Sequence, residues 1–190
     1  YPLKIAWGLW GFGPHHAFTW NPHFFKYPSL TIYAQFVGQA LLYAGLSLAG
    51  RIHSALDFRV LWATDKTAFA LTGRFITALF GAAIAPATFV LVRRLMRGPA
   101  GPAGESATLR EALANAAAWT AALLTASNPG LIAKSQEIDV DVPLAFFVTL
   151  AAVQALGLFE RMTRTKCLLL GATVGLAASS KYPGAIALVP

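Results

Sequence analysis

Three carboxylates lie within residues 134–141 (KSQEIDVD): Glu137, Asp139 and Asp141. Carboxylates in such a cluster can take a proton from a hydroxyl group or hold a cation. Asp139 and Asp141 are two positions apart, so they would diverge on a helix, but they point to one side of an extended loop, which we expect here. A second interpretation, compatible with the first, is that Asp141 is the N-cap of the next helix, with Pro143 in its first turn.

A second group of chemically active side chains lies in residues 21–30 (NPHFFKYPSL), just before an apolar run. The two prolines predict the end of a loop and the start of a helix, and the aromatic rings are typical of lipid headgroup depth. His23 and Lys26 offer positive charge to a lipid phosphate. The alternative for Lys26 is a lysine that only extends its ammonium to the membrane interface. No spacing of histidines and carboxylates matches a metal site, so we predict none.

Composition indicates an integral membrane protein. Hydrophobic residues make up 56% of the chain and charged residues only 12%, about half the ~25% charged residues of a soluble domain. The formal net charge is +7, but the basic residues form short clusters between apolar runs. This pattern is typical of cytoplasmic loops and argues against a nucleic-acid partner.

The single cysteine, Cys167, excludes an internal disulfide and any metal site built from several thiolates. We expect it to be a buried, unreactive thiol. The chain starts without methionine and stops within an apolar stretch. We therefore interpret it as an internal piece of a longer protein.

The apolar runs predict an all-α fold, a polytopic bundle of transmembrane helices. Residues 1–28 are expected to form an outer loop and residues 183–190 the start of a further helix. The predicted helical segments between them are 29–50, 75–92, 113–133, 142–159 and 167–180. Fourteen residues at 167–180 cover only about 21 Å of a ~30 Å hydrocarbon core. That segment is expected to be tilted into a protein-lined cavity or to be one half of a broken helix.

The basic clusters set the predicted orientation. Residues 93–110 and 160–166 are rich in arginine and lysine, so they are expected on the cytoplasmic side. The chain must cross twice between them, which places residues 134–141 on the outer face. We expect residues 29–50 to lie in the outer interface, because their glutamines and glycines make a poor lipid-facing span. If they crossed fully, the opening loop would face the cytoplasm instead.

This orientation predicts one outer face on which polar side chains converge. The expected members are Lys4, His15, His16, His23, Lys26, Glu137, Asp139, Asp141 and Lys181.

The stretch NPHFFKYPSLTIY resembles the first luminal or periplasmic loop of membrane glycosyltransferases with the GT-C fold. The resemblance is to the group of protein O-mannosyltransferases and aminoarabinose transferases. Three later stretches are similar to further segments of that family in the same order: ALTGRFITALFGAAIAPATFVLVRRL, NPGLIAKSQEIDVDVPLAFF and LLLGATVGLAASSKYPG. The resemblance covers nearly the whole chain and implies the N-terminal membrane part of such an enzyme.

The resemblance implies an inverting transfer of a hexose or pentose from a polyprenyl-phosphate donor to a protein or lipid acceptor at the outer membrane face. It implies that Asp141 assists catalysis, with Asp139 and Lys181 as further candidates. The residues implied to bind the donor phosphate are His23, Lys26, Tyr27 and Arg74. The family has a lysine or aromatic residue directly before the first proline of its motif, and in this sequence Tyr27 holds that position.

In the family, the main acidic residue follows the first transmembrane helix, whereas no acidic residue precedes Asp57 in this sequence. We therefore expect that residue upstream of Tyr1 and expect residues 1–190 alone to be inactive. A divalent cation is the one cofactor left open. The alanine-rich composition favours a bacterial inner (plasma) membrane with the site on the periplasmic or extracellular side. Two alternative functions are a transporter with broken helices and a non-catalytic membrane scaffold.

Overall fold

The computed structural model describes residues 2–12, 17–24, 26–97 and 105–184. All regular structure within these ranges is helical, so the predicted all-α fold is confirmed. Most of the predicted final helix, residues 185–190, lies outside the described residues, as do His15 and His16. The helices are α1 (Pro2–Gly8), α2 (Leu30–Leu48), α3 (Ala55–Thr64), α4 (Thr67–Arg97), α5 (Glu105–Ala126), α6 (Pro129–Ser135), α7 (Asp141–Glu160) and α8 (Arg164–Ser180).

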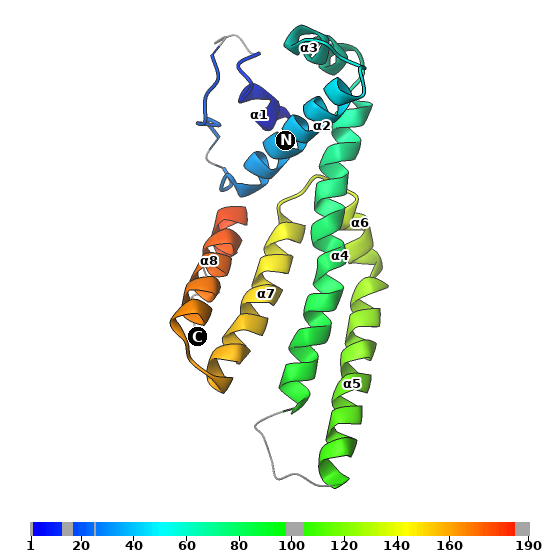
Figure 1. Ribbon diagram of the computed structural model, residues 1–190, viewed down its shortest axis with the longest axis vertical. Coiled ribbons are helices and arrows are strands. Elements are labelled where there is room, and N and C mark those ends of the chain that lie inside the picture. Colours follow the sequence, from blue (N-terminus) through cyan, green and yellow to red (C-terminus); the bar gives the residue numbers. More distant parts are fainter. Residues whose placement is uncertain (1, 13–16, 25, 98–104, 185–190) are drawn as a thin grey trace.

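Helices α4, α5, α7 and α8 form a bundle in which α4 packs against both α5 and α7, and α8 runs beside α7 (Figure 1). Among the described residues, α4 and α7 are the two helices long and apolar enough to cross a membrane. Both expose much of their apolar surface, as expected for helices that face lipid and not a soluble core.

A stripe of mostly small residues lets neighbouring helices approach α4 closely. Gly73, Thr77 and Gly81 lie on one buried face of α4. A Cβ atom at Gly81 would collide with the Ser135 side chain of α6, and one at Gly73 would collide with Gln35 of α2. Such small residues allow the close backbone contact that stabilises helix pairs in lipid.

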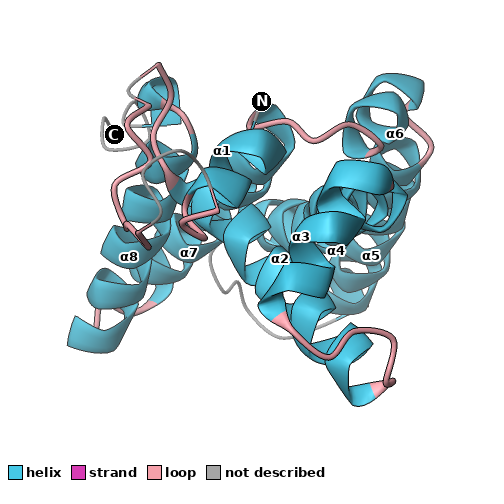
Figure 2. Ribbon diagram, turned by 90° about the horizontal axis from the view of Figure 1, so that it is seen from above, coloured by secondary structure: helices cyan, strands magenta, loops and turns pink. Residues whose placement is uncertain are grey.

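Helices α1, α2 and α3 form a cap over one end of the bundle (Figures 1 and 2). Its core is aromatic: Trp7 stacks on Trp62 with ring centroids 4.4 Å apart, and Phe58 and Phe69 are fully buried beside them. Ser54 and Asp57 form a reciprocal capping box at the start of α3. These contacts fix the cap to the beginning of α4.

Helix α2 lies obliquely across the end of the bundle (Figure 1). Its Gly38 packs against Thr72 and Ile76, which belong to the first turns of α4. Helix α2 therefore meets only the capped end of α4. This arrangement favours the predicted interfacial location of residues 29–50, which stays a prediction.

Several helices begin or end at residues other than those predicted from the apolar runs. Residues 75–92 are only the middle of α4, which begins at Thr67 and ends at Arg97. Residues 113–133 are divided between α5 and α6 at Asn128, whose Oδ1 accepts a hydrogen bond from Leu131 N at 3.0 Å while Pro129 opens α6. Thr163 caps α8, so the helix starts three residues before the apolar run.

The expectation that Cys167 is buried was wrong. The thiol is exposed, because Cys167 lies in the first turns of α8 on a face that no described helix covers. Labelling experiments therefore need a Cys167→Ser background.

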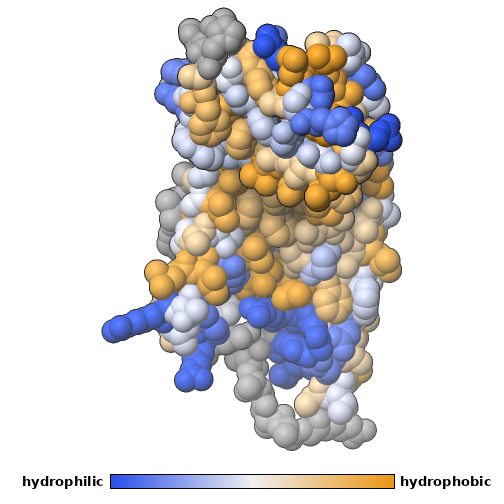
Figure 3. Space-filling model, turned by 45° about the horizontal axis from the view of Figure 1, so that its top comes forward, coloured by the Kyte–Doolittle hydropathy of each residue, from blue (hydrophilic) through white to orange (hydrophobic). Residues whose placement is uncertain are grey.

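Hydrophilic side chains gather at the end opposite the cap, below an apolar middle zone (Figure 3). Arg93 and Arg97 of α4 both pair with Glu111 of α5. Arg94 donates to Val153 O at 2.9 Å, and Lys166 donates to Gly157 O at 2.6 Å, so both cations contact the C-terminal part of α7. Cations near a helix C-terminus are stabilised by its partial negative charge.

The two ends of the bundle predict opposite labelling patterns. In a Cys167→Ser background, Ala107→Cys reports on the basic end and Gln136→Cys reports on the capped end; both positions are exposed. By the positive-inside rule, a membrane-impermeant maleimide should label Ala107→Cys only from the cytoplasmic side and Gln136→Cys only from the opposite side. Labelling of both positions from one side would contradict the arrangement.

Candidate functional site

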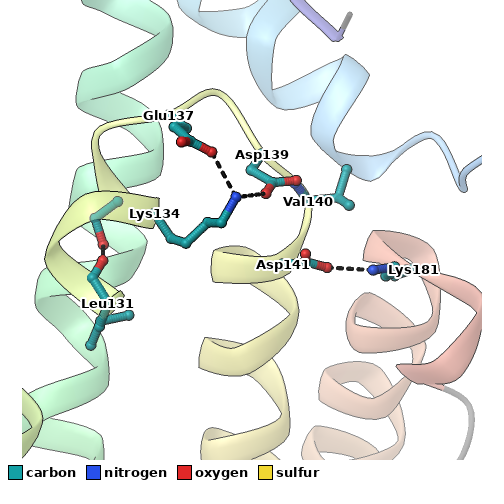
Figure 4. Close-up of polar contacts among 8 residues, drawn as sticks. Leu131, Lys134, Glu137, Asp139, Val140, Asp141 and Lys181 are labelled. Carbon is teal, nitrogen blue, oxygen red and sulfur yellow. Dashed lines mark hydrogen bonds and ion pairs between the residues drawn. The ribbon is translucent and has the colours of Figure 1, made fainter. Parts of the chain in front are cut away.

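The start of α7 and the end of α8 are joined by an ion pair at the capped end. Lys181 Nζ lies 2.6 Å from Asp141 Oδ1, although the residues are 40 positions apart (Figure 4). The hydrogen bond to Asp141 raises the pKa of Lys181 above its usual value, and nearby Tyr27 and Asp139 contribute in the same direction. The fold thus brings together Tyr27, Asp139, Asp141 and Lys181, four of the residues expected at the site.

The two aspartates do not point to one side, so that expectation was wrong (Figure 4). Asp139 Oδ2 lies 3.6 Å from Lys134 Nζ, which also contacts Glu137 Oε2 at 2.8 Å. The contact with Glu137 is the main reason that the pKa of Lys134 is raised. Asp141 turns instead to Lys181. The carboxylates diverge because each pairs with a cation on a different helix.

The prediction that Asp141 is the N-cap of α7 was also wrong. Val140 holds the N-cap position, Asp141 is the first residue of the helix, and no side chain caps it. A carboxylate in the first turn still interacts favourably with the positive end of the helix. Asp141 Oδ1 accepts a hydrogen bond from Lys181 Nζ.

A small pocket of about 210 Å³ lies between α1, the start of α2 and the loop before α7. Most of its wall is apolar, with Tyr27, Thr31 and Asp139 as the polar residues. Pockets for drug-sized ligands measure about 300–1,000 Å³. This pocket therefore suits one small group, about the size of a sugar ring, and we call it the polar pocket.

The other expected phosphate-binding residues lie outside the polar pocket. Lys26 is exposed, with its Nζ 5.8 Å from the centroid of the Tyr27 ring. His23 is exposed and has a left-handed backbone (φ 48°), stabilised by a hydrogen bond from its N to Asn21 Oδ1 at 2.9 Å. Arg74 is exposed on α4. Because Tyr27 lines the pocket, its contact with Lys26 places Lys26 beside the pocket.

Sequence reasoning missed Thr31. Its side chain lines the polar pocket, is only 4% exposed, and its hydroxyl has no hydrogen-bond partner. The one sequence signal was a hydroxyl residue directly after the PSL motif, at the start of an apolar helix.

An apolar groove of about 880 Å³ runs between α2 and α4 and reaches Phe146 of α7. Leu30 and Tyr33 line this groove, whereas Thr31 and Ile32 line the polar pocket. The first turn of α2 therefore separates the polar pocket, which has three polar residues in its wall, from the more uniformly apolar groove.

No metal site is formed in the part of the chain that the structure describes, because no three His, Cys, Asp or Glu side chains are close enough to share an ion. In the acidic loop, Lys134 supplies the positive charge between Glu137 and Asp139. These residues do not fit a divalent cation site.

Residues 106–190 match the family described as dolichyl-phosphate-mannose-protein mannosyltransferase. The match confirms the predicted resemblance over residues 106–190. The match includes Asp139, Asp141 and Lys181 but not Lys26 or Tyr27. No curated protein and no solved structure matches the chain. The description of the matched family names a mannosyltransferase and a dolichyl-phosphate-mannose donor.

The pair of Asp141 and Lys181 should show energetic coupling. We expect Asp141→Asn and Lys181→Met each to lower the free energy of unfolding, with a coupling energy of about 0.2–1 kcal/mol, because both side chains are partly exposed. Denaturant titrations of the single and double variants in detergent micelles would measure it. As a control, Lys134→Met combined with Asp141→Asn should be additive. A coupling energy of zero between Asp141 and Lys181 would show that their ion pair does not stabilise the structure.

Proposed function

We propose that the chain is part of an enzyme that transfers mannose from a polyprenyl-phosphate carrier to a protein hydroxyl group. The observation that carries the proposal is that the polar pocket and the apolar groove adjoin at the start of α2, with the Asp141–Lys181 pair near Tyr27 of the pocket wall. Residues 106–190 of the same chain match a mannosyltransferase family. The same match favours a transferase over a transporter or a non-catalytic scaffold.

The two compartments suit the two parts of the donor. The groove has an apolar lining and runs along α2 and α4, which fits a polyprenyl chain. The cations Lys26 and Lys181 lie near Tyr27, at the pocket. Cations and a phenol hydroxyl bind phosphate oxygens through charge-assisted hydrogen bonds. The donor phosphate would therefore lie near Tyr27, and exposed His23 and Arg74 would act only as more distant positive charges.

The reaction needs a group that receives a proton and groups that stabilise a leaving phosphate. The acceptor oxygen attacks the anomeric carbon, its proton passes to a carboxylate, and the bond from that carbon to the phosphate oxygen breaks. Cations stabilise the negative charge that develops on the phosphate. We assign Asp141 an auxiliary role: Lys181 holds one of its oxygens, so its carboxylate is positioned to orient the acceptor hydroxyl.

We place the reaction on the outer side of the membrane, with a bacterial inner membrane as the favoured location. The support is the cluster of Arg93, Arg94 and Arg97 at the C-terminal end of α4, opposite the polar pocket. Clusters of this kind face the cytoplasm in most membrane proteins.

Lys26→Ala should lower turnover in the full-length enzyme. A charge-assisted hydrogen bond to phosphate contributes about 1.5–3 kcal/mol, so the expected loss of kcat/KM is about tenfold to a hundredfold. Turnover is measured with polyprenyl-phosphate mannose and an acceptor peptide in detergent. Lys66→Ala is the matched control, because Lys66 is an exposed lysine at the start of α4, beside Trp62 and outside the pocket. Equal activity of both variants would refute a phosphate contact by Lys26.

Asp141→Asn should reduce kcat more strongly than it affects folding. The amide keeps the shape of the side chain but cannot hold the same charge interaction or accept a proton. We expect a loss of about a hundredfold or more in kcat, with a change in stability of only about 1 kcal/mol. A kcat within about twofold of the wild type would show that the residue has only a structural role.

A further inference from the structure

Thr31 differs from other hydroxyl residues in these helices. Thr72, Thr77 and Ser180 each donate a hydrogen bond to the carbonyl oxygen four residues earlier. Thr31 cannot do so, because it is the second residue of α2 and the residue four positions earlier, Tyr27, lies in the preceding loop. Its hydroxyl is buried without any partner. Buried hydroxyl groups rarely stay unpaired in folded proteins.

A second unpaired oxygen lies one turn further along the same face of α2. Gln35 is 1% exposed, and its Nε2 donates to Gly73 O at 3.3 Å, but its Oε1 has no partner. Gln39, the next residue on this face, accepts from Trp10 Nε1 at 2.9 Å and donates to Leu3 O at 3.0 Å. The glutamine under the cap is thus fully paired, whereas the two residues nearer the polar pocket are not.

Of the two residues with unpaired oxygens, Thr31 belongs to the wall of the polar pocket and Gln35 lies behind that wall. Thr31 lines the pocket directly, and so does Ile138. The Ile138 side chain and Gln35 Oε1 both press against Gly73 of α4, so Gln35 lies immediately behind the wall. Because both oxygens are shielded from solvent, a ligand reaches them by displacing side chains of this wall.

The polar groups of the pocket select a ligand that donates hydrogen bonds. The Asp139 carboxylate accepts and the Thr31 hydroxyl can do either, while Gln35 Oε1, behind the wall, can only accept. A phosphate offers acceptors and negative charge, so Asp139 disfavours it. A sugar ring offers several hydroxyl donors, and its C–H face suits the apolar wall formed by residues such as Phe24 and Val140.

We infer that the polar pocket is the subsite for the sugar of the donor, and that Thr31 and Gln35 accept hydrogen bonds from the hydroxyl groups of this sugar. The inference rests on the proposed function and deepens it. The phosphate then lies outside the pocket, towards Lys26 and Lys181, and the polyprenyl chain continues into the apolar groove on the other side of the first turn of α2.

The test compares two carriers in the full-length protein in lipid nanodiscs: polyprenyl-phosphate mannose and polyprenyl phosphate without sugar. Thr31→Val keeps the shape of the side chain and removes the hydroxyl. We expect its affinity for the mannose-bearing carrier to fall about fivefold to a hundredfold, while its affinity for the bare carrier stays the same. Thr31→Ser keeps the hydroxyl and should bind both carriers within about twofold of the wild type.

Thermal unfolding separates this role from a structural one. If the hydroxyl has no partner within the protein, Thr31→Val should keep or raise the melting temperature. Thr31→Ala provides a second variant without the hydroxyl, and the same selective loss is expected for it. An unchanged affinity for mannose-bearing carrier, or equal weakening for both carriers, would overturn the sugar subsite. Failure of the wild type to bind either carrier would overturn the proposed function itself.

Discussion

The arrangement of the whole chain depends on how closely other helices can approach α4. Its glycines at positions 73 and 81 leave room for Gln35 of α2 and Ser135 of α6 against the helix backbone. At the other end, Arg93 and Arg94 hold α5 and α7 through an ion pair and a carbonyl contact. In lipid there is little hydrophobic force between helices, so close packing and polar contacts of this kind determine which helices meet.

The close approach at Gly73 also explains why the candidate site exists where it does. It brings Gln35 against the backbone of α4 and places Ile138 beside it, so the loop before α7 closes over the start of α2. A larger residue at Gly73 would push α2 away and separate Thr31 from Asp139. The close packing at Gly73 therefore determines the shape of the polar pocket as well as the position of α2 in the bundle.

Charged side chains have different kinds of partner at the two ends of the bundle. At the basic end, arginines and a lysine neutralise Glu111 and the carbonyl groups of α7, which stabilises the bundle. At the capped end, Lys134 pairs with both Glu137 and Asp139, and Lys181 pairs with Asp141. Paired but partly exposed groups of this kind contribute little to stability, and they stay accessible to a ligand.

The sequence by itself determined the helical class, the family resemblance and the separation of basic from acidic loops, because hydropathy and charge act locally and can be read along the chain. It also identified Tyr27, Asp139, Asp141 and Lys181, whose residue types signal chemistry. Only the tertiary structure decided which of them meet, since a contact across 40 residues, such as that of Asp141 with Lys181, leaves no local pattern. Thr31 and Gln35 stand out only in three dimensions, because an unpaired oxygen is defined by what surrounds it.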